Sequence, residues 1–503
     1  MCLCSGLLGC ALPALDERPE SFALDSDLAR DTHLGRVVSP LVDAHPNTSG
    51  IHPLQRPIDA FAARGLLAHL AERTLDVQYY HWNNDLTGTL LLEALHAAAE
   101  RGVRVRLLLD DVGTRGLEAE LAALNAHPNL EVRLFNPFPM RRAKWFGLLT
   151  DFPRLNRRMH NKSFTADNQV AIVGGRNVGD AYFGAAGVLY SDLDVLTIGP
   201  IVEEISRDFD RYWSSESAHV AEQVLRPIPP DRENRFASGS FLIEQEAGAA
   251  KYMSKVGQSA LIGDLLYGQL PFEWAKTRIL SDDPAKALGL ADKEALLIHQ
   301  LEDIKGEPQG SVTLVSPYFV PTAASAKVFS DMARRGVDVR ILTNSSDATP
   351  VPPVHAGYAR RRRQLLEAGV KLYELRSLIP AVTPDDDYVP FAAPSSALHA
   401  KVFSVDDKRV YIGSFNFDPR SENLNTEVGL VIESPTLARQ ISTAFDTSVR
   451  ANAHEVRLKK DGRMYWVKFV DDEAHHSYTE PYAGFWRRRG IFLMGILPIE
   501  WLL

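Results

Sequence analysis

The segment HNKSFTADNQVAIVGGRN at residues 160–177 recurs as HAKVFSVDDKRVYIGSFN at residues 399–416. Both copies follow the pattern H-x-K-x4-D-x6-G-[GS]-x-N, with every internal spacing retained. Polar and apolar residues alternate after each lysine, and a turn at the aspartate leads into a second apolar run, which predicts a β-hairpin. Residues i and i+2 of a strand share one face, so each histidine projects beside the lysine two positions later.

The repeat extends well beyond the two hairpins. Upstream of each copy come a strand-like run, a helical stretch and the string Arg-Gly-Val-x-Val-Arg, at residues 101–106 and 335–340. That string is typical of a helix closed by glycine and followed by a buried strand. Downstream, Asp192 and Glu427 stand at matching points. The alternation predicts an α/β protein of two duplicated α/β/α domains on mixed sheets, related by a pseudo-two-fold axis around one shared active site.

The extent of the repeat also predicts the domain boundaries. Residues 216–270 match nothing in the other half and contain a proline-rich turn, which indicates a linker. We expect a leader and linker over 1–50, a first domain over 51–215, the linker over 216–270, a second domain over 271–450 and a C-terminal membrane-interface segment over 451–503.

Composition limits the classes of function that the chain can have. Its 503 residues are 45% hydrophobic and 24% charged, as in an ordinary globular protein. The net charge of −9 argues against a general nucleic-acid binder, so no nucleic-acid partner is expected. The three cysteines all lie within the first ten residues, so the body of the chain has neither a disulfide nor a cysteine metal site.

Three segments suggest contact with a membrane. Leu7-Leu8-Gly9-Cys10 resembles the bacterial lipoprotein processing box, which predicts lipidation at Cys10; the alternative is an incidental apolar start, since the basic n-region of a signal peptide is missing. Residues 485–503 and 137–158 mix basic, aromatic and apolar side chains in the manner of a membrane interface. The alternatives are a C-terminal segment docked on the core and a solvated loop. No stretch has the 18 or so apolar residues of a spanning helix.

Two imidazoles and two ammonium groups suit the cleavage of a phosphodiester without a metal. One neutral imidazole can attack phosphorus while the other, protonated, gives its proton to the leaving oxygen. The lysines would hold the non-bridging oxygens, and Asp192 and Glu427 could each fix the tautomer of a histidine ring. Neither a metal nor another cofactor is expected, because the chain has no H-E-x-x-H string or cysteine pairing. The expected catalytic residues are His160, Lys162, Asp167, His399, Lys401 and Asp406, supported by Asn177, Ser414, Asn416, Asp192 and Glu427.

The two motifs resemble those of the phospholipase D superfamily over roughly residues 55 to 450. The strings at 173–183 and 413–421 are similar to the bacterial cardiolipin synthases, and those at 354–358 and 497–500 to their C-type branch. Gly175 departs from the pattern, because it stands where the second copy has Ser414.

The resemblance implies transphosphatidylation through a phosphohistidine, with phosphatidylglycerol as acceptor and phosphatidylethanolamine or phosphatidylglycerol as donor. It implies that His160 is the nucleophile and His399 the acid. It also implies that the partners are phospholipids and a membrane surface, with an accessory protein as a further candidate. The implied location is the bacterial inner membrane. A phospholipase D-type hydrolase, a nuclease and a non-catalytic binding protein remain the alternatives.

Overall fold

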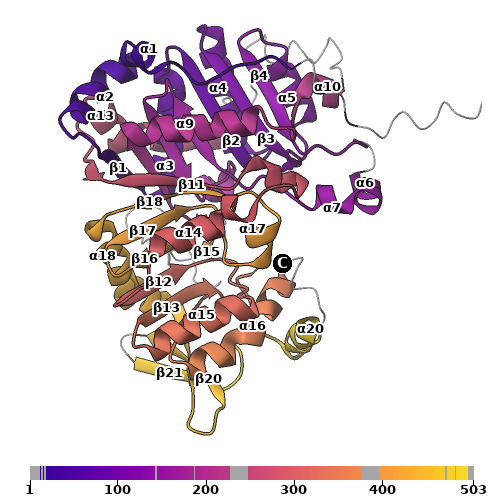
Figure 1. Cartoon of the computed structure of the whole chain (residues 1–503), viewed down its shortest axis with the longest axis vertical. Coiled ribbons are helices and arrows are strands. Elements are labelled where there is room, and N and C mark those ends of the chain that lie inside the picture. The colour runs from indigo at the N-terminus through magenta and orange to yellow at the C-terminus, as the bar shows by residue number, and fades with distance from the viewer. Residues whose placement is uncertain are drawn as a thin grey trace, which may run out of the picture.

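The described part of the chain forms two α/β units stacked on one another in the computed structural model (Figure 1). The residues described are 12, 15, 18–141, 144–185, 187, 189–226, 247–349, 351–376, 396–470, 473–481 and 483–496. Cys10 and the string at 497–500 lie outside them. Among the described helices, none has both the length and the apolar character needed to cross a membrane.

The first unit is built on a nine-stranded mixed sheet. Its strands, in spatial order, are β10 (Glu273–Ala275), β1 (Ser49–Leu54), β8 (Asp194–Ile198), β6 (Val170–Gly174), β5 (Ser163–Ala166), β2 (Thr74–His81), β3 (Arg104–Gly113), β4 (Leu130–Phe135) and β9 (Ala218–Val220). β2, β3 and β4 pair in parallel, and the other neighbours are antiparallel.

The described residues of the first unit also form helices. They are α1 (Ser26–Arg30), α2 (His33–Asp43), α3 (Pro57–Leu70), α4 (Leu86–Glu100), α5 (Glu118–Asn125), α6 (Lys144–Thr150), α7 (Phe152–Leu155), α8 (Asp180–Phe183), α9 (Pro200–Trp213), α10 (Ala221–Val224), α12 (Ala247–Gly257) and α13 (Ala260–Leu266). The region expected to be a linker therefore contains β9, α10, α12 and α13, and its Tyr252, Leu261 and Leu265 are buried in the first core. Residues 273–275, expected in the second domain, form an edge strand of the first sheet.

The second unit repeats the arrangement on a ten-stranded sheet. Its strands, in spatial order, are β11 (Thr277–Ser281), β18 (Val428–Ile432), β17 (Arg409–Gly413), β16 (Lys401–Val405), β12 (Ser311–Val315), β13 (Asp338–Asn344), β14 (Lys371–Leu375), β19 (Ala453–Leu458), β20 (Met464–Val470) and β21 (Glu473–Ser477). β12, β13 and β14 pair in parallel, as β2, β3 and β4 do. The last three strands lie in the segment expected at a membrane interface, so much of that segment extends the second sheet.

The helical elements of the second unit are, in chain order, the 3-10 turns η1 (Pro284–Leu288) and η2 (Lys293–Ala295), α14 (Leu297–Lys305), α15 (Ala323–Arg334), α16 (Pro352–Glu367), α17 (Pro419–Asn423), α18 (Pro435–Ala444), the π-helical turn η3 (Phe445–Val449), α19 (Arg450–Asn452) and α20 (Phe485–Ile496). Gly102 and Gly336 follow α4 and α15 with φ of 91° and 94°, in the left-handed region that glycine adopts most readily. The predicted helix ends in the two Arg-Gly-Val strings are thus confirmed.

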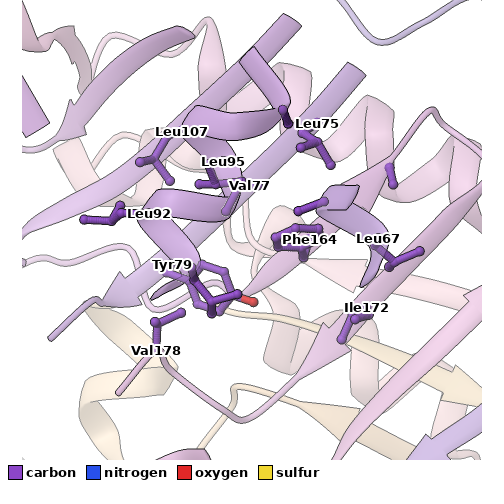
Figure 2. Close-up of a cluster of buried hydrophobic side chains, with 14 of the residues drawn as sticks. Leu67, Leu75, Val77, Tyr79, Leu92, Leu95, Leu107, Phe164, Ile172 and Val178 are labelled. Atoms are coloured by element: carbon purple, nitrogen blue, oxygen red, sulfur yellow. The ribbon is translucent and has the colours of Figure 1, made fainter. Parts of the chain in front are cut away.

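Two large apolar clusters hold the molecule together. In the first, Val77 and Leu107 of the sheet lie beside Leu92 and Leu95 of α4 (Figure 2). The second cluster contains side chains of both units, including Val173, Val195, Ile412 and Leu430, all at most 1% exposed. The sheets therefore share one core where β6 and β8 meet β17 and β18.

Candidate active site

The two repeated segments form the predicted hairpins, β5–β6 and β16–β17. The turn residues Asp167 and Asn168 have φ of 50° and 51°, and Asp406 and Asp407 have 53° and 50°. The N–H of Gln169 donates to the carbonyl of Ala166, and that of Lys408 to the carbonyl of Val405, so each pair forms the centre of a β-turn. Positive φ at both central residues gives such a turn the twist of hairpin strands. Because β5 runs antiparallel to β2, and β16 to β12, each hairpin starts at the carboxyl end of the parallel strands, where its histidine lies.

Asp167 and Asp406 do not reach the histidines, which corrects their expected catalytic role. The carboxylate of Asp167 accepts hydrogen bonds from the backbone N–H groups of Glu72, Arg73 and Thr74, at 2.8 to 2.9 Å. Asp406 accepts from residues 309, 310 and 311 in the same way, at 2.7 to 3.1 Å. Each aspartate sits in its hairpin turn, at the far end from the histidine, and ties that turn to the strand beside it.

Each histidine is held by a carboxylate from the other unit. His160 Nδ1 lies 2.7 Å from Glu427 Oε2, and His399 Nδ1 lies 2.6 Å from Asp192 Oδ2. The sequence predicts that these acids orient the histidines, and the structure shows that the pairing crosses between the units. All four side chains are largely buried, with exposed fractions of 8% and 15% for the two histidines and 0% for both acids.

Backbone hydrogen bonds reinforce the crossing. The N–H of His160 donates to the carbonyl of Thr426 at 2.8 Å, and that of His399 donates to Ser191 at 2.9 Å. Thr426 and Ser191 each precede the acid of their unit. β7 (Leu189–Ser191) also pairs in parallel with β15 (Ser396–Leu398), so main chain as well as side chain links the units at this point.

Both lysines of the motifs are buried beside their own histidines. Lys162 Nζ donates to the carbonyl of His160, and Lys401 Nζ donates to that of His399 at 2.5 Å. Burial lowers the pKa of Lys401 to about 8 and that of Lys162 well below its usual value, although the site carboxylates oppose the shift. A bound anion beside these lysines would therefore stabilise their charged form, which burial disfavours.

The two histidine–carboxylate pairs differ in charge. Burial lowers the pKa of His160 well below its usual value, and of His399 to about 4, with the lysines lowering both further. Burial raises the pKa of Glu427 to about 7, against the effect of Lys162. For Asp192 burial acts in the same direction, but the contact with His399 outweighs it and the pKa falls. Asp192 is therefore ionised and opposes the fall in the pKa of His399, whereas the Glu427 carboxyl beside His160 takes up a proton near neutrality.

Ser414 and Gly175, which stand at matching points of the motifs, contact Glu427 and Asp192 respectively. Ser414 Oγ donates to Glu427 Oε2 at 2.5 Å, so its hydroxyl supports the carboxylate directly. A Cβ atom on Gly175 would lie 2.1 Å from Asp192 Oδ1, which leaves no room for a serine. The missing hydroxyl in the first unit is thus a consequence of the shorter acid beside it.

The two asparagines of the motifs lie in the walls of the site. Asn177 accepts from the N–H of His81 at 3.2 Å and donates to Tyr182 Oη at 3.0 Å. Asn416 donates its backbone N–H to Ser421 Oγ at 3.3 Å, and its buried Oδ1 has no hydrogen-bond partner among the described residues. Direct contact of either amide with a phosphate therefore stays a prediction.

A further pair of residues positions the histidines and was missed from the sequence. Asp110 and Asn344 stand at matching points at the carboxyl ends of β3 and β13. Asp110 Oδ2 accepts the N–H of Met159 at 2.8 Å, and Asn344 Oδ1 accepts that of Leu398 at 3.0 Å. Met159 and Leu398 each precede the histidine of a motif. The signal in the sequence was a polar residue at the same position of both repeated strands, nine residues after the arginine of each Arg-Gly-Val string.

Aromatic rings line both sides of the site. The ring of Tyr80 lies 4.9 Å from that of His160, and those of Tyr182 and Tyr190 lie 5.1 and 5.4 Å from that of His399. His81 is close enough to be affected by the charges of Lys162 and His399, and burial lowers its pKa to about 4. Tyr80 and His81 belong to the Tyr-Tyr-His string that ends β2, so the sequence contained a signal for this side of the site.

Comparisons with known proteins agree with this geometry. The profile of a family described as "Cardiolipin synthase, PLD-like domain" matches residues 67–213 and 302–449. The chain is 50% identical to cardiolipin synthase C of Escherichia coli (strain K12), over 93% of this chain and 99% of that protein. It is 26% identical to a cardiolipin synthase of Staphylococcus aureus (strain Mu50 / ATCC 700699), over 78% of this chain and 66% of that protein.

A solved structure shares the fold. The phosphatidylserine synthase of Haemophilus influenzae Rd KW20 superposes with a TM-score of 0.56 at 15% identity, covering 93% of this chain and 100% of that one. The duplicated α/β fold and the resemblance seen in the sequence are both confirmed.

Proposed function

The chain belongs to the cardiolipin synthase family of PLD-like proteins, and from that membership we propose that it is a phosphatidyltransferase that makes cardiolipin. The acceptor is the glycerol hydroxyl of phosphatidylglycerol, and the donor is phosphatidylethanolamine or phosphatidylglycerol. The observation that carries the proposal is the reciprocal pairing of His160 with Glu427 and of His399 with Asp192. It gives one site two oriented imidazoles, one for each half of a double displacement.

In the first step His160 attacks phosphorus. Its Nδ1 carries the proton held by Glu427, so the lone pair on Nε2 is available as the nucleophile. The N–P bond forms as the P–O bond to the donor headgroup breaks. His399, which the bound phosphate anion and Asp192 together favour in its protonated form, gives its proton to the departing alkoxide. Lys162 and Lys401 neutralise the non-bridging oxygens as charge develops on them.

In the second step His399, now neutral, takes the proton of the acceptor hydroxyl. The acceptor oxygen attacks phosphorus, the N–P bond breaks, and His160 leaves with its original protonation. His399 regains its proton, so the cycle needs no further acid or base. Water in place of the glycerol hydroxyl would give phosphatidic acid, which is the hydrolase alternative.

The charge difference between the two pairs supports His160 as nucleophile. Asp192 is the stronger anion of the two acids, and an imidazolium at His399 gains most from it. A phosphatidyl ester of p-nitrophenol tests the assignment, because this leaving group departs without an acid. His399→Ala should release about one equivalent of nitrophenol and retain the phosphatidyl group on His160, which mass spectrometry would detect. His160→Ala should release none, and the reverse pattern would exchange the two roles.

The transferase and hydrolase activities are separated by their products. Purified full-length protein is mixed with phosphatidylglycerol, with and without phosphatidylethanolamine, and the lipids are resolved by thin-layer chromatography. Cardiolipin is the expected product, and phosphatidic acid alone would contradict the synthase proposal. Because only purified protein is present, the same assay shows whether an accessory protein is needed.

Membrane association follows from the substrates, and its form is part of the proposal. We expect the protein at the bacterial inner membrane, with Cys10 lipidated after removal of the residues before it. Mass spectrometry of the mature N-terminus gives the answer. A diacylated Cys10 supports the anchor, whereas a retained Met1 excludes it.

A further inference from the structure

Two short helices in different units expose large apolar side chains. On α6, Phe146 is 42% and Leu149 is 73% exposed. On α20, Trp486 is 83% and Leu493 is 62% exposed. Single exposed apolar residues are ordinary on protein surfaces, so these four matter only if their positions are related.

The segment that carries α6 is attached to the edge of the sheet where His160 lies. Asp111, at the carboxyl end of β3, accepts the N–H of Phe138 at 2.8 Å and pairs with Arg141 at 2.5 Å and Lys144 at 3.5 Å. The preceding residue, Asp110, holds the residue before His160. Adjacent residues of β3 therefore hold the α6 segment and the residue before His160.

α20 has the matching attachment in the second unit. Arg487 Nε donates to Ser346 Oγ at 3.3 Å, and its Nη2 donates to the Ser346 carbonyl. Ser346 follows by two positions Asn344, which holds the residue before His399. Ile491, only 6% exposed, is buried where α20 packs on α16, so the helix is docked with Trp486 and Leu493 left outward.

The two helices lie on the same side of the molecule. In Figure 1 both are at the right, α6 above and α20 below the level at which the units meet. The exposed apolar residues Leu28 on α1 and Tyr267 after α13 belong to elements at the left. Their contacts with Asp111 and Ser346 place both helices near the carboxyl ends of β3 and β13.

The charge near these helices is opposite to that of the whole chain. Lys144 begins α6 with a 30% exposed side chain, and Arg487 and Arg489 are exposed on α20, in a chain whose net charge is −9. Tryptophan and leucine beside cations suit the boundary between anionic headgroups and acyl chains.

We propose that α6 and α20 dock together on an anionic phospholipid surface, so that the edge carrying both histidines faces the lipid. This inference rests on the proposed function, which supplies lipid substrates that lie in a bilayer. Docking at two points on either side of the unit boundary fixes the orientation of the site as well as its distance from the headgroups.

Vesicle binding tests the surface directly. Full-length protein carrying Cys10→Ser, so that a lipid on this cysteine cannot dominate binding, is floated with vesicles of phosphatidylglycerol and phosphatidylethanolamine. Phe146→Ser with Leu149→Ser, and Trp486→Ser with Leu493→Ser, should each lower the partition coefficient about ten-fold. The control pair Leu28→Ser with Tyr267→Ser, whose side chains are 58% and 79% exposed on elements at the other side, should stay within about two-fold.

A second variant pair tests the charge. Lys144→Gln with Arg489→Gln should weaken binding about ten-fold or more on vesicles rich in phosphatidylglycerol and little on neutral vesicles. Binding that survives both the apolar and the charge substitutions would overturn the proposal and leave this surface to a protein partner.

Activity separates failure of the docking from failure of the proposed function. On a water-soluble short-chain phosphatidylglycerol, the apolar variants should turn over within about two-fold of the parent, while turnover on vesicles falls with binding. A parent protein that binds vesicles but makes no cardiolipin would refute the function alone. Variants that lose soluble turnover as completely as vesicle turnover would refute the docking role.

Discussion

At the scale of single residues, Asp192 and Glu427 differ in the direction of their pKa shifts, although each contacts a histidine in the same way. Both acids contact a ring nitrogen at hydrogen-bond distance. Only Asp192 has its pKa lowered, whereas burial raises that of Glu427 to about 7. We therefore expect Asp192 to favour a protonated His399 once a phosphate is bound, and Glu427 to hold the tautomer of His160.

Replacing each acid by its amide should reveal that difference. Asp192→Asn keeps the size but removes the charge that supports protonated His399, and kcat should fall about a hundred-fold or more. Glu427→Gln should cost less at neutral pH, because the native carboxyl already shares a proton there. Steady-state kinetics on mixed micelles measures both, with KM little changed. Equal losses would contradict the assigned roles.

Lys401 should set the alkaline limb of the pH profile. Burial lowers the pKa of its ammonium to about 8, so the group is charged below that pH and loses its proton above it. Because the charged form binds phosphate, kcat/KM should fall as pH rises through about 8. Lys401→Arg stays charged throughout, and its remaining activity should lack this limb. An unchanged limb in that variant would assign it to another group.

At the scale of elements, locally coded features could be predicted from the sequence. The hairpins depend on alternation and a turn, and the helix ends at Gly102 and Gly336 depend on one residue each. The roles of Asp167 and Asp406 could not be predicted, because their partners lie 93 to 97 residues away in the chain. A motif residue at fixed spacing looks catalytic whether it serves the reaction or the turn.

Removing the two turn carboxylates should affect stability before chemistry. Asp167 is fully buried and accepts three backbone N–H groups, so Asp167→Ala should lower the free energy of unfolding by about 1 to 3 kcal/mol. Asp406→Ala should cost less, because its partners at residues 309 and 310 are exposed. Denaturant unfolding measures the loss, and the pH profile of kcat should not move. A shifted profile with intact stability would restore the catalytic role.

At the scale of the whole molecule, the site exists only because two units share a core. The sequence predicted two copies of the motif and one shared site. It could not predict that each acid serves the histidine of the other unit, since that depends on how the sheets meet. Buried apolar side chains of both units meet at this contact, among them Val173, Val195, Ile412 and Leu430.

A shared core should make the two units unfold together. Calorimetry of the full chain should show one transition whose van't Hoff and calorimetric enthalpies agree, despite a length at which two domains are common. Leu430→Ala should lower that single midpoint rather than split it. Two separate transitions in the parent protein would show that the interface contributes little to stability.

The fit of Gly175 against Asp192, and of Ser414 against Glu427, has a consequence for other members of the family. A short acid requires a glycine beside it, and a long acid accepts a serine hydroxyl at 2.5 Å. Substitution at one position without the other creates either a clash or an unsupported carboxylate. Aligned relatives should therefore change these positions as pairs, glycine with aspartate and serine with glutamate. With that covariation, the identities of two residues in a relative of unknown structure would indicate whether the acid beside each histidine is ionised at neutral pH.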